Sequence, residues 1–167
     1  DIINFSKNYS FNDKFVLSKG HAVPVLYATF CQLGLISSEE LLSLRQIGSK
    51  LQGHPDRTKL CHLDAGTGAL GQGLSISIGY LLGNKLLNTN NKVYCVVGDG
   101  ELQEGQIWEA AMYAGSNLDN RLICIIDNNR LQNETWVNDT LSLGDIEKKW
   151  KSFGWTTKVI DGHSILE

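Results

Sequence analysis

The chain has 167 residues with a formal net charge of −3, and 42% of its residues are hydrophobic. This length suits one domain with a real core and is short for two. Without a basic cluster we expect no nucleic acid and no anionic membrane as partner, and no apolar run approaches the roughly 20 residues of a membrane span. The four cysteines show no C-x-x-C spacing and the amino terminus shows no secretory signal pattern, which favours a reducing, cytoplasmic location.

The first part of the chain predicts two helices and a polar loop. Residues 15–33 predict a helix that packs on a sheet and opens near Gly20-His21. Ser37 and Glu40 form a capping box that starts a second helix, and this helix carries Leu41, Leu42, Leu44 and Ile47. Residues 48–68 are rich in polar residues and include Gly53-His54-Pro55, and loops on a rigid scaffold are where functional residues concentrate. Cys61, His62 and His54 have neither the spacing nor the ligand count of a structural zinc site.

A long apolar helix is predicted for residues 70–87. Ser75, Gly79 and Gly83 recur at every fourth position and form a stripe of small residues along it. Glycine costs roughly 1 kcal/mol in a helix interior, so this stripe predicts close packing against another helix or subunit.

Two short apolar runs, residues 93–97 and 122–126, predict fully buried strands of a parallel sheet. The helical stretch between them, 102–114, is long enough for a crossover, which makes one βαβ unit. Gly98-Asp99-Gly100 closes the first run and Asp127-Asn128-Asn129 closes the second. Neighbouring parallel strands lie about 4.8 Å apart, so Asp99 and Asn129 are expected at one carboxyl edge, within reach of one cation.

The residue types at this edge suit a divalent cation and a phosphate. A carboxylate from Asp99 and an amide oxygen from Asn129 are ligands that Mg²⁺ prefers, and they leave positions for water and phosphate oxygens. Gly98 and Gly100 allow phosphate to approach the backbone closely, beside the amides that start the next helix. Each cluster alone is more typical of an ordinary turn or polar loop, and only the phased pair favours the metal site.

The end of the chain predicts a helix over 145–153, ended by Gly154, and a third strand over 155–160. Asp161-Gly162-His163 then stands at a strand end, and the simplest interpretation of this tripeptide is a turn.

Beyond these patterns, the chain resembles the thiamine diphosphate enzymes, and within them the transketolase family. The general signature is a Gly-Asp-Gly followed further along by Asn-Asn. Four longer blocks resemble transketolase in the right order: DKFVLSKGHA at 13–22, GHP at 53–55, TGALGQG at 67–73 and GDGELQEG at 98–105. The sequence SKGH at 18–21 and the sequence QIWEAA at 106–111 are most similar to the N-terminal subunit of a split transketolase.

The resemblance implies a fold and a domain. We expect an α/β fold in which a parallel sheet is flanked by helices on both faces, as in the diphosphate-binding domain of these enzymes. Residues 1–167 are expected to form a single, incomplete domain of this kind, lacking the domain that binds the aminopyrimidine and the C-terminal domain.

The resemblance also implies roles for individual residues. The Mg²⁺ ligands would be Asp99, Asn129 and the backbone carbonyl of Leu131, with Ca²⁺ or Mn²⁺ able to substitute. His21 would contact the cofactor diphosphate and His54 the substrate hydroxyl groups. The other implied cofactor-binding residues are Gly68, Leu70, Gly98, Gly100 and Glu104.

Simpler interpretations stand beside these roles. Either histidine could be a hydrogen-bonded structural residue, and Leu70, which the resemblance places on the thiazolium ring, could be plain core packing. Glu104 and Glu109 could do no more than complement a helix dipole. By resemblance, Glu104 faces the dimer interface and hydrogen-bonds the activating glutamate of the partner domain, and Glu109 continues that network. Asn133 departs from the family, which usually has an apolar residue there, and Glu134-Thr135 replaces the usual Asp-Gly turn.

The expected function is therefore transfer of a two-carbon ketol unit from a ketose phosphate to an aldose. This chain would supply the Mg²⁺ and diphosphate half of the site and require a complementary C-terminal subunit, in a homodimer or heterotetramer. One alternative is a related thiamine diphosphate enzyme acting on a specialised sugar or on pyruvate. Another is a non-catalytic scaffold of the same fold. A nicotinamide-binding protein is disfavoured because no G-x-G-x-x-G follows the first strand.

Overall fold

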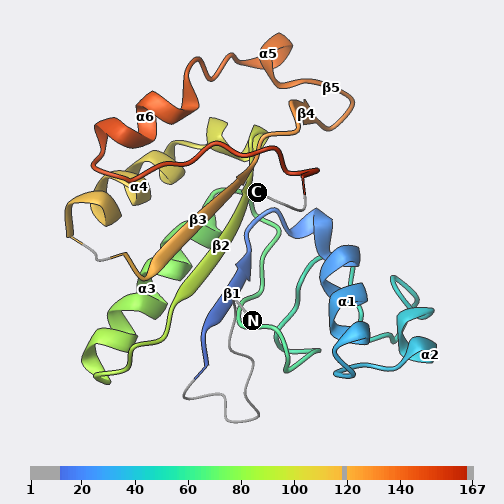
Figure 1. The fold of residues 1–167 in the computed structure, drawn as a ribbon. Helices are drawn as coiled ribbons and strands as arrows, with labels where there is room; N and C mark the ends of the chain where they lie inside the picture. Colours follow the sequence, from blue (N-terminus) through green and yellow to red (C-terminus); the bar gives the residue numbers. More distant parts are fainter. Residues whose placement is uncertain (1–11, 118–119, 165–167) are drawn as a thin grey trace.

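The centre of the molecule is a three-stranded parallel sheet with the order β1-β2-β3 (Figure 1). The computed structural model describes residues 12–117 and 120–164. The strands are β1 (Lys14–Leu17), β2 (Val93–Gly98) and β3 (Leu122–Asp127). Leu17 lies opposite Val96 in one ladder and Gly98 lies opposite Asp127 in the other. The prediction that the runs at 93–97 and 122–126 are neighbouring parallel strands is confirmed.

The third strand of this sheet comes from the region predicted to be helical. Residues 15–17 belong to β1 and pair with β2, so the prediction of one helix over 15–33 is wrong at its start. A 3₁₀ turn, η2 (Gly20–Ala22), follows, and α1 (Val23–Gln32) then begins with Pro24 in its first turn. A three-residue apolar run cannot distinguish a strand from a helix by periodicity, and pairing with β2 decides the matter.

One face of the sheet is covered by three helices. They are α3 (Gln72–Leu86), α4 (Gly105–Asn117), which follows the 3₁₀ turn η3 (Gly100–Gln103), and α6 (Ile146–Ser152). Val93, Cys95 and Val97 of β2 are fully buried in this core. They are alternate residues and therefore point to the same face of the sheet.

The other face is covered by α1 and the long loop after it. Leu17 packs here with Tyr27, Leu51 and Leu63, and Val96 of β2 adds to this second core. Helices therefore flank the parallel sheet on both faces, as expected. Burial of β3 was predicted wrongly, because Ile125 is 46% exposed. In the described residues β3 is an edge strand, and an edge strand is less completely covered than a central one.

The predicted second helix is shorter than its apolar pattern indicated. The capping box is confirmed: Ser37 Oγ accepts from Glu40 N–H at 3.1 Å, and Glu40 Oε2 accepts from Ser37 N–H at 3.0 Å. Helix α2 (Ser38–Leu41) nevertheless ends after one turn, and Arg45 adopts a φ of 62°. Leu41 and Leu44 pack against the second core, whereas Leu42 and Ile47 are exposed, so only part of the predicted apolar face is buried.

The carboxyl-terminal part contains both confirmed and wrong predictions. Helix α6 begins after the N-cap Asp145, and Gly154 follows it with a φ of 91°, as predicted. Residues 155–160 have no regular secondary structure, so the strand predicted there is wrong. Trp155 donates its indole N–H to the Ala111 carbonyl at 2.8 Å and meets Trp150 edge-on at 4.8 Å. This segment is held by its aromatic side chain rather than by a ladder.

Three short elements were not predicted. They are β4 (Leu131–Gln132), β5 (Thr135–Trp136) and α5 (Val137–Thr140), and they lie beyond the carboxyl end of β3 (Figure 1). Asp161, Gly162 and His163 form a turn, in which Ser164 N–H donates to the Asp161 carbonyl at 2.9 Å. The tripeptide does not end a strand, in agreement with the simpler interpretation.

The small-residue stripe of α3 meets open space. A Cβ atom added to Gly79 or Gly83 would have no neighbour within 4 Å, so no described helix of this chain packs there. Both glycines line a groove of about 770 Å³ between α3 and residues 57–64. Packing against another subunit stays a prediction.

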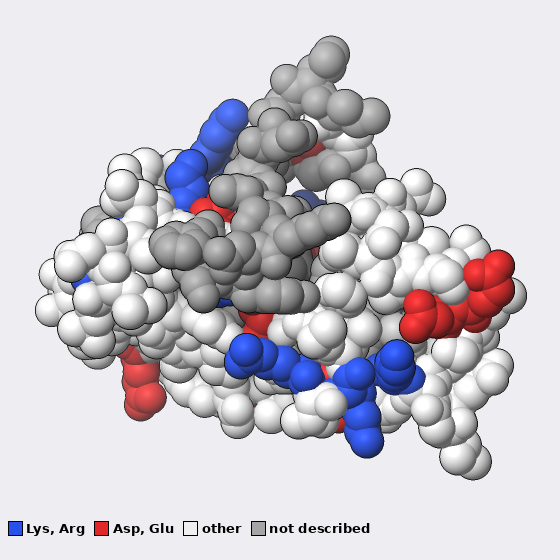
Figure 2. Space-filling model, turned by 90° about the horizontal axis from the view of Figure 1, so that it is seen from below, with Lys and Arg blue, Asp and Glu red and all other residues white. Residues whose placement is uncertain are grey.

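Charges of both signs are mixed on the face of the molecule shown in Figure 2. Basic side chains (Lys, Arg) and acidic side chains (Asp, Glu) occur there in small groups, separated by uncharged residues. Among the described residues, none of the helices combines the length and apolar character needed to cross a bilayer.

Candidate functional site

The carboxyl ends of the three strands bring the predicted site residues to one edge of the sheet. Ser18 to His21 follow β1, Asp99 follows β2, and Asn129 lies two residues beyond β3. Because β2 lies between its two neighbours, Asp99 is flanked by the other two segments. Edges of this kind are where open parallel sheets bind ligands.

Asp99 is a buried carboxylate, only 2% exposed. Its Oδ1 accepts from Gly100 N–H at 2.8 Å, and its Oδ2 accepts from Arg130 N–H. Among the described residues it forms no ion pair with Lys, Arg or His. A buried carboxylate is costly without charge compensation, so this one suits a cation bound beside it.

Asn129 lies beside the Asp99 carboxylate, because the next residue, Arg130, donates its backbone N–H to Asp99 Oδ2. Its Oδ1 accepts from Leu131 N–H at 2.8 Å, and its Nδ2 donates to Asp127 Oδ2 at 3.2 Å. An amide oxygen has two lone pairs, so Oδ1 retains one for a metal ion. No described group of three or more His, Cys, Asp or Glu side chains could hold a metal. A cation at Asp99 would therefore depend on amide, carbonyl, water and phosphate oxygens.

A lysine that was not predicted bridges the outer strands. Lys19 Nζ donates to Asp127 Oδ2 at 2.6 Å, and the lysine side chain is only 9% exposed. A Cβ atom added to Gly98 would lie 3.8 Å from Lys19 Cβ, so the side chain passes over the end of β2. No sequence signal pointed to this pair, because the residues before Lys19 were predicted to be helical and β1 was recognised only in the structure.

His21 and His54 come from different segments, η2 and the loop at residues 53–55, and both of these segments pack close to Gly68. A Cβ on Gly20 would lie 2.9 Å from Gly68 N, and a Cβ on Gly68 would lie 3.1 Å from His54 Cγ. Gly68 also has a φ of 142°, a conformation that side-chain-bearing residues rarely adopt. Partial desolvation lowers the pKa of His21, and the positive charge of Lys19 lowers that pKa further. A lowered pKa favours the neutral form of the His21 ring near pH 7.

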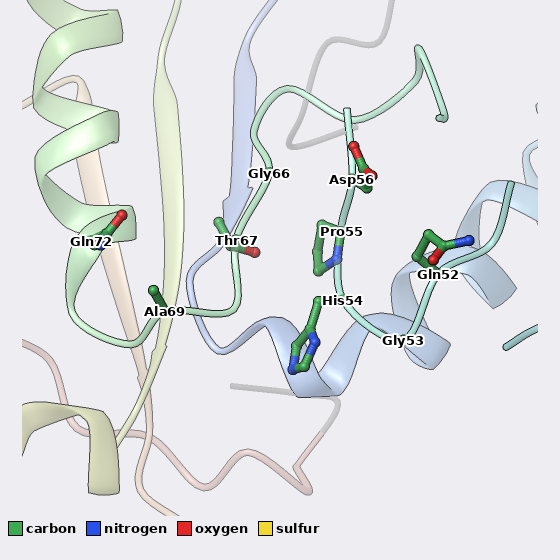
Figure 3. A pocket seen from close by; sticks show the side chains of 9 residues that line it. All are labelled: Gln52, Gly53, His54, Pro55, Asp56, Gly66, Thr67, Ala69 and Gln72. Carbon is green, nitrogen blue, oxygen red and sulfur yellow. The ribbon is translucent and has the colours of Figure 1, made fainter. Parts of the chain in front are cut away.

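His54 lines an open pocket of about 460 Å³. Figure 3 shows the segment around His54 running beside the segment from Gly66 to Ala69. Thr67 ties these segments to the sheet, because its N–H donates to the Pro55 carbonyl at 3.1 Å and its Oγ1 donates to the Leu17 carbonyl at 2.6 Å. Polar side chains of Gln52, Asp56, Thr67 and Gln72 share the lining, so the pocket suits a hydroxylated ligand.

The remaining predicted residues lie near the start of α3 and α4. Leu70 is half-buried, belongs to neither described core, and accepts from Gln106 Nε2 through its carbonyl at 2.9 Å. Glu104 is exposed, and its Cβ would lie 2.9 Å from a Cβ added to Gly71. Glu109 is exposed on α4. Their roles stay predictions.

Besides Lys19, two further residues of the site were missed. Gln132 packs on Gly100, where an added Cβ would lie 2.8 Å from Gln132 Cβ, and its buried Oε1 has no hydrogen-bond partner within residues 12–117 and 120–164. Glu101 is 2% exposed and accepts hydrogen bonds from residues of other segments. No sequence signal pointed to Gln132, whereas Glu101 stood inside the quoted GDGELQEG block without a role.

Comparison with known proteins gives consistent similarities. The profile of the family described as "Transketolase, thiamine diphosphate binding domain" matches residues 4–167. Mouse transketolase is 43% identical over 157 residues, which is 93% of this chain and 25% of the mouse protein. The 6-deoxy-6-sulfo-D-fructose transketolase subunit SqwG of Clostridium sp. (strain MSTE9) is 41% identical over 155 residues, which is 93% of this chain and 56% of that subunit.

The fold is similar to that of solved transketolases as well. A transketolase mutant from Pichia stipitis has a TM-score of 0.86 and 30% identity, over 92% of this chain and 25% of that chain. Transketolase from Campylobacter jejuni has a TM-score of 0.82 and 32% identity. The chain thus spans a quarter of the length of the mouse and Pichia proteins and about half of the clostridial subunit.

Proposed function

This chain belongs to the transketolase family, matching its thiamine diphosphate-binding domain over residues 4–167, and we propose that it holds the diphosphate and metal ion of a ketol-transferring enzyme. A two-carbon ketol unit would pass from a ketose phosphate donor to an aldose acceptor. The observation that carries the proposal is the buried carboxylate of Asp99. Among the described residues it has no cationic partner, and it accepts a hydrogen bond from the backbone N–H of Arg130, the residue after Asn129.

The metal would be held by oxygen atoms of three residues. These are the Asp99 carboxylate, the Asn129 amide and the Leu131 backbone carbonyl, and Mg²⁺ would complete its octahedron with water and phosphate oxygens. Ca²⁺ or Mn²⁺ would substitute, because the donor set is all oxygen. Thiamine diphosphate, when bound, supplies the electron sink for breaking and making the carbon–carbon bond. The residues of this chain would bind the metal ion and the cofactor and orient them.

The two histidines would serve different ligands. His21 lies in the loop after β1, near Lys19 and Asp127, and a neutral imidazole there can donate one hydrogen bond to a diphosphate oxygen. His54 lines the open pocket with polar neighbours, and would bind hydroxyl groups of the sugar. This division supports His54 as the substrate-contacting residue and His21 as a cofactor-contacting one.

The activity would require a complementary domain or C-terminal subunit. Proton transfer needs a group within hydrogen-bond distance of the reacting atom. Glu104 lies between η3 and α4, four residues after Gly100, and is exposed, so it would face the phosphate end or a partner surface rather than the aminopyrimidine ring. We therefore assign the activating acid to the partner and Glu104 to contact with it.

One alternative within the same class has a specific support. The clostridial relative is described as acting on 6-deoxy-6-sulfo-D-fructose and as a subunit, which favours a split enzyme with a specialised sugar as second candidate. Comparing xylulose 5-phosphate with a sulfonated ketose as donor, at equal concentrations, separates the two candidates.

Reconstitution tests the proposal. The purified chain is assayed for ketol transfer with thiamine diphosphate, Mg²⁺ and each donor, alone and with the complementary domains of the same enzyme. We expect no turnover and weak cofactor binding alone, and transfer after the partner is added. Robust transfer from xylulose 5-phosphate by the chain alone would overturn the partner requirement. Absence of metal-dependent cofactor binding in the assembled protein would overturn the function.

A further inference from the structure

Glu101 is a buried acid that the roles above leave unused. Its side chain is enclosed where β1, β2 and the loop before α3 meet, and it is 2% exposed. Its Oε1 accepts from Ser18 Oγ and from Gly71 N–H at 2.8 Å, while its Oε2 accepts from Gly98 N–H at 3.1 Å. The network continues one step further, because Ser18 Oγ accepts from Gly73 N–H at 3.1 Å.

The donors belong to three separate segments of the chain. Ser18 follows β1, Gly71 precedes α3, and Gly98 ends β2. Each segment also carries a residue assigned above to the cofactor or the metal: His21 on the first, Gly68 and Leu70 on the second, and Asp99 on the third. One carboxylate is therefore the common acceptor of all three segments.

The chemistry of the contact calls for a carboxylate. Every partner of Glu101 is a donor, and an ionised carboxylate offers acceptors only. A glutamine would turn an N–H₂ group toward at least one of these donors and leave it unsatisfied. The positive end of the α3 dipole lies beside the same oxygens, because Gly71 is the N-cap of α3.

Close packing makes the network geometrically strict. A Cβ added to Gly73 would lie 2.3 Å from Ser18 Oγ, so the start of α3 approaches the end of β1 as closely as backbone allows. Loss of the Glu101 acceptor would release Gly71 N–H and Ser18 together and loosen the loop between residues 67 and 73.

We infer that Glu101 is the positioning residue of the cofactor cradle: it does not touch the cofactor, and it holds the loops after β1 and before α3 against the end of β2. The inference rests on the proposed function, since it assigns the cradle to thiamine diphosphate.

The test compares Glu101→Gln and Glu101→Asp with the matched control Glu39→Gln, an exposed acid of α2, in the assembled enzyme. Cofactor affinity is measured by calorimetry at fixed Mg²⁺, below the unfolding temperature of each variant. Hydrogen exchange of the Gly71 and Gly73 amides is followed in parallel. We expect Glu101→Gln to weaken cofactor binding about 10- to 100-fold, as for outer-shell partners of metal ligands, with faster exchange at both amides.

The other readouts separate positioning from folding. Glu101→Asp keeps the charge on a shorter side chain and should restore part of the affinity, and saturating cofactor should recover most of kcat for both variants. Glu39→Gln should match wild type. A lowered unfolding temperature with unchanged cofactor affinity would overturn the inference and leave Glu101 merely structural.

Ser18→Ala provides a second route if Glu101→Gln does not fold. It removes one donor and the acceptor for Gly73 while leaving the carboxylate, so we expect weaker cofactor binding and faster exchange at Gly73. Unchanged affinity in Ser18→Ala and Glu101→Asp alike would overturn the inference. Failure of wild type to bind cofactor would instead refute the proposed function and, with it, the cradle.

Discussion

The two halves of the site differ in how their side chains are held. At the end of β2, Asp99 and Glu101 are buried and each accepts backbone hydrogen bonds. In the adjoining loops, His21 and His54 are exposed, and so is Glu104. The side chains of the buried half are already held by hydrogen bonds within this chain, which suits groups that hold a fixed diphosphate and cation. The open half is exposed among the described residues, and under the proposed function a complementary domain would cover it; the chain spans a quarter of the length of mouse transketolase.

Removing Asp99 should have the largest effect on ligand binding. Asp99→Ala deletes the only carboxylate of the proposed metal site and leaves Gly100 N–H and Arg130 N–H without an acceptor. We expect Mg²⁺-dependent binding of thiamine diphosphate to weaken at least about 100-fold, since outer-shell changes alone cost up to that much. Calorimetry measures the affinity and circular dichroism the retained fold.

The exposed Asp139 of α5 provides the control for this experiment. Asp139→Ala makes the same chemical change outside the buried half and should bind cofactor as wild type does. Unchanged cofactor affinity in Asp99→Ala would rule out the metal site. The buried half would then have no special role in ligand binding.

Close packing inside the open half is tested at Gly68. Gly68→Ala forces a Cβ to within 3.1 Å of His54 Cγ at a φ of 142°, and we expect a loss of about 1–3 kcal/mol in the free energy of unfolding. Gly79→Ala is the matched change on open helix surface and should be stabilising by about 0.5–1 kcal/mol. Thermal unfolding of both variants measures the difference.

Two outcomes would count against these expectations. Equal unfolding temperatures for Gly68→Ala and wild type would show that the loop packing is not constrained. If Gly79→Ala instead weakens assembly with the complementary domains, the small-residue stripe packs against a subunit, as predicted from the sequence.

The histidines of the open half should separate by ligand. His54→Ala is expected to raise the donor KM or lower kcat with cofactor affinity unchanged, and His21→Ala to weaken cofactor binding. Each change removes about one hydrogen bond to a charged or polar ligand. We therefore expect about a tenfold change in the donor KM or kcat for His54→Ala and in cofactor affinity for His21→Ala. Steady-state kinetics at varied donor and varied cofactor gives both numbers. The reverse pattern would exchange the two assignments.

The smallest effect concerns cysteines and leaves the activity untouched. Burial raises the pKa of the Cys95 thiol in β2 to about 12, so this group stays protonated and enclosed in the folded protein. Cys61 is exposed. An alkylating reagent at about pH 8 should therefore modify Cys61 first and Cys95 only on unfolding, because the thiolate is the reactive form. Mass spectrometry of digested protein measures the order, and early labelling of Cys95 would contradict the described core.

Several features of the fold could be predicted because their signals are local. The capping box at Ser37 and Glu40 is a contact between residues three apart. The end of α6 at Gly154 follows from the left-handed conformation that glycine adopts easily. Two longer apolar runs, each closed by polar residues, predicted that β2 and β3 are neighbours.

Other features depended on partners far away in the sequence. Residues 15–17 form a strand because β2 pairs with them, across more than 75 residues. Residues 155–160 form none, because Trp155 is instead anchored on Ala111 and Trp150. In both cases a short apolar pattern was compatible with more than one structure, and tertiary contacts selected one.

The sequence by itself determined which candidate site residues this chain carries, because the Gly98 to Gly100 and Asp127 to Asn129 clusters and the blocks around His21 and His54 are short local patterns. Only the tertiary structure decided how these clusters are held together. Ser18 and Glu101 are separated by 83 positions, and Lys19 and Asp127 by 108. Such pairs leave no periodicity in a single sequence, since a hydrogen bond between distant side chains forms only after the sheet has brought their strand ends to one edge.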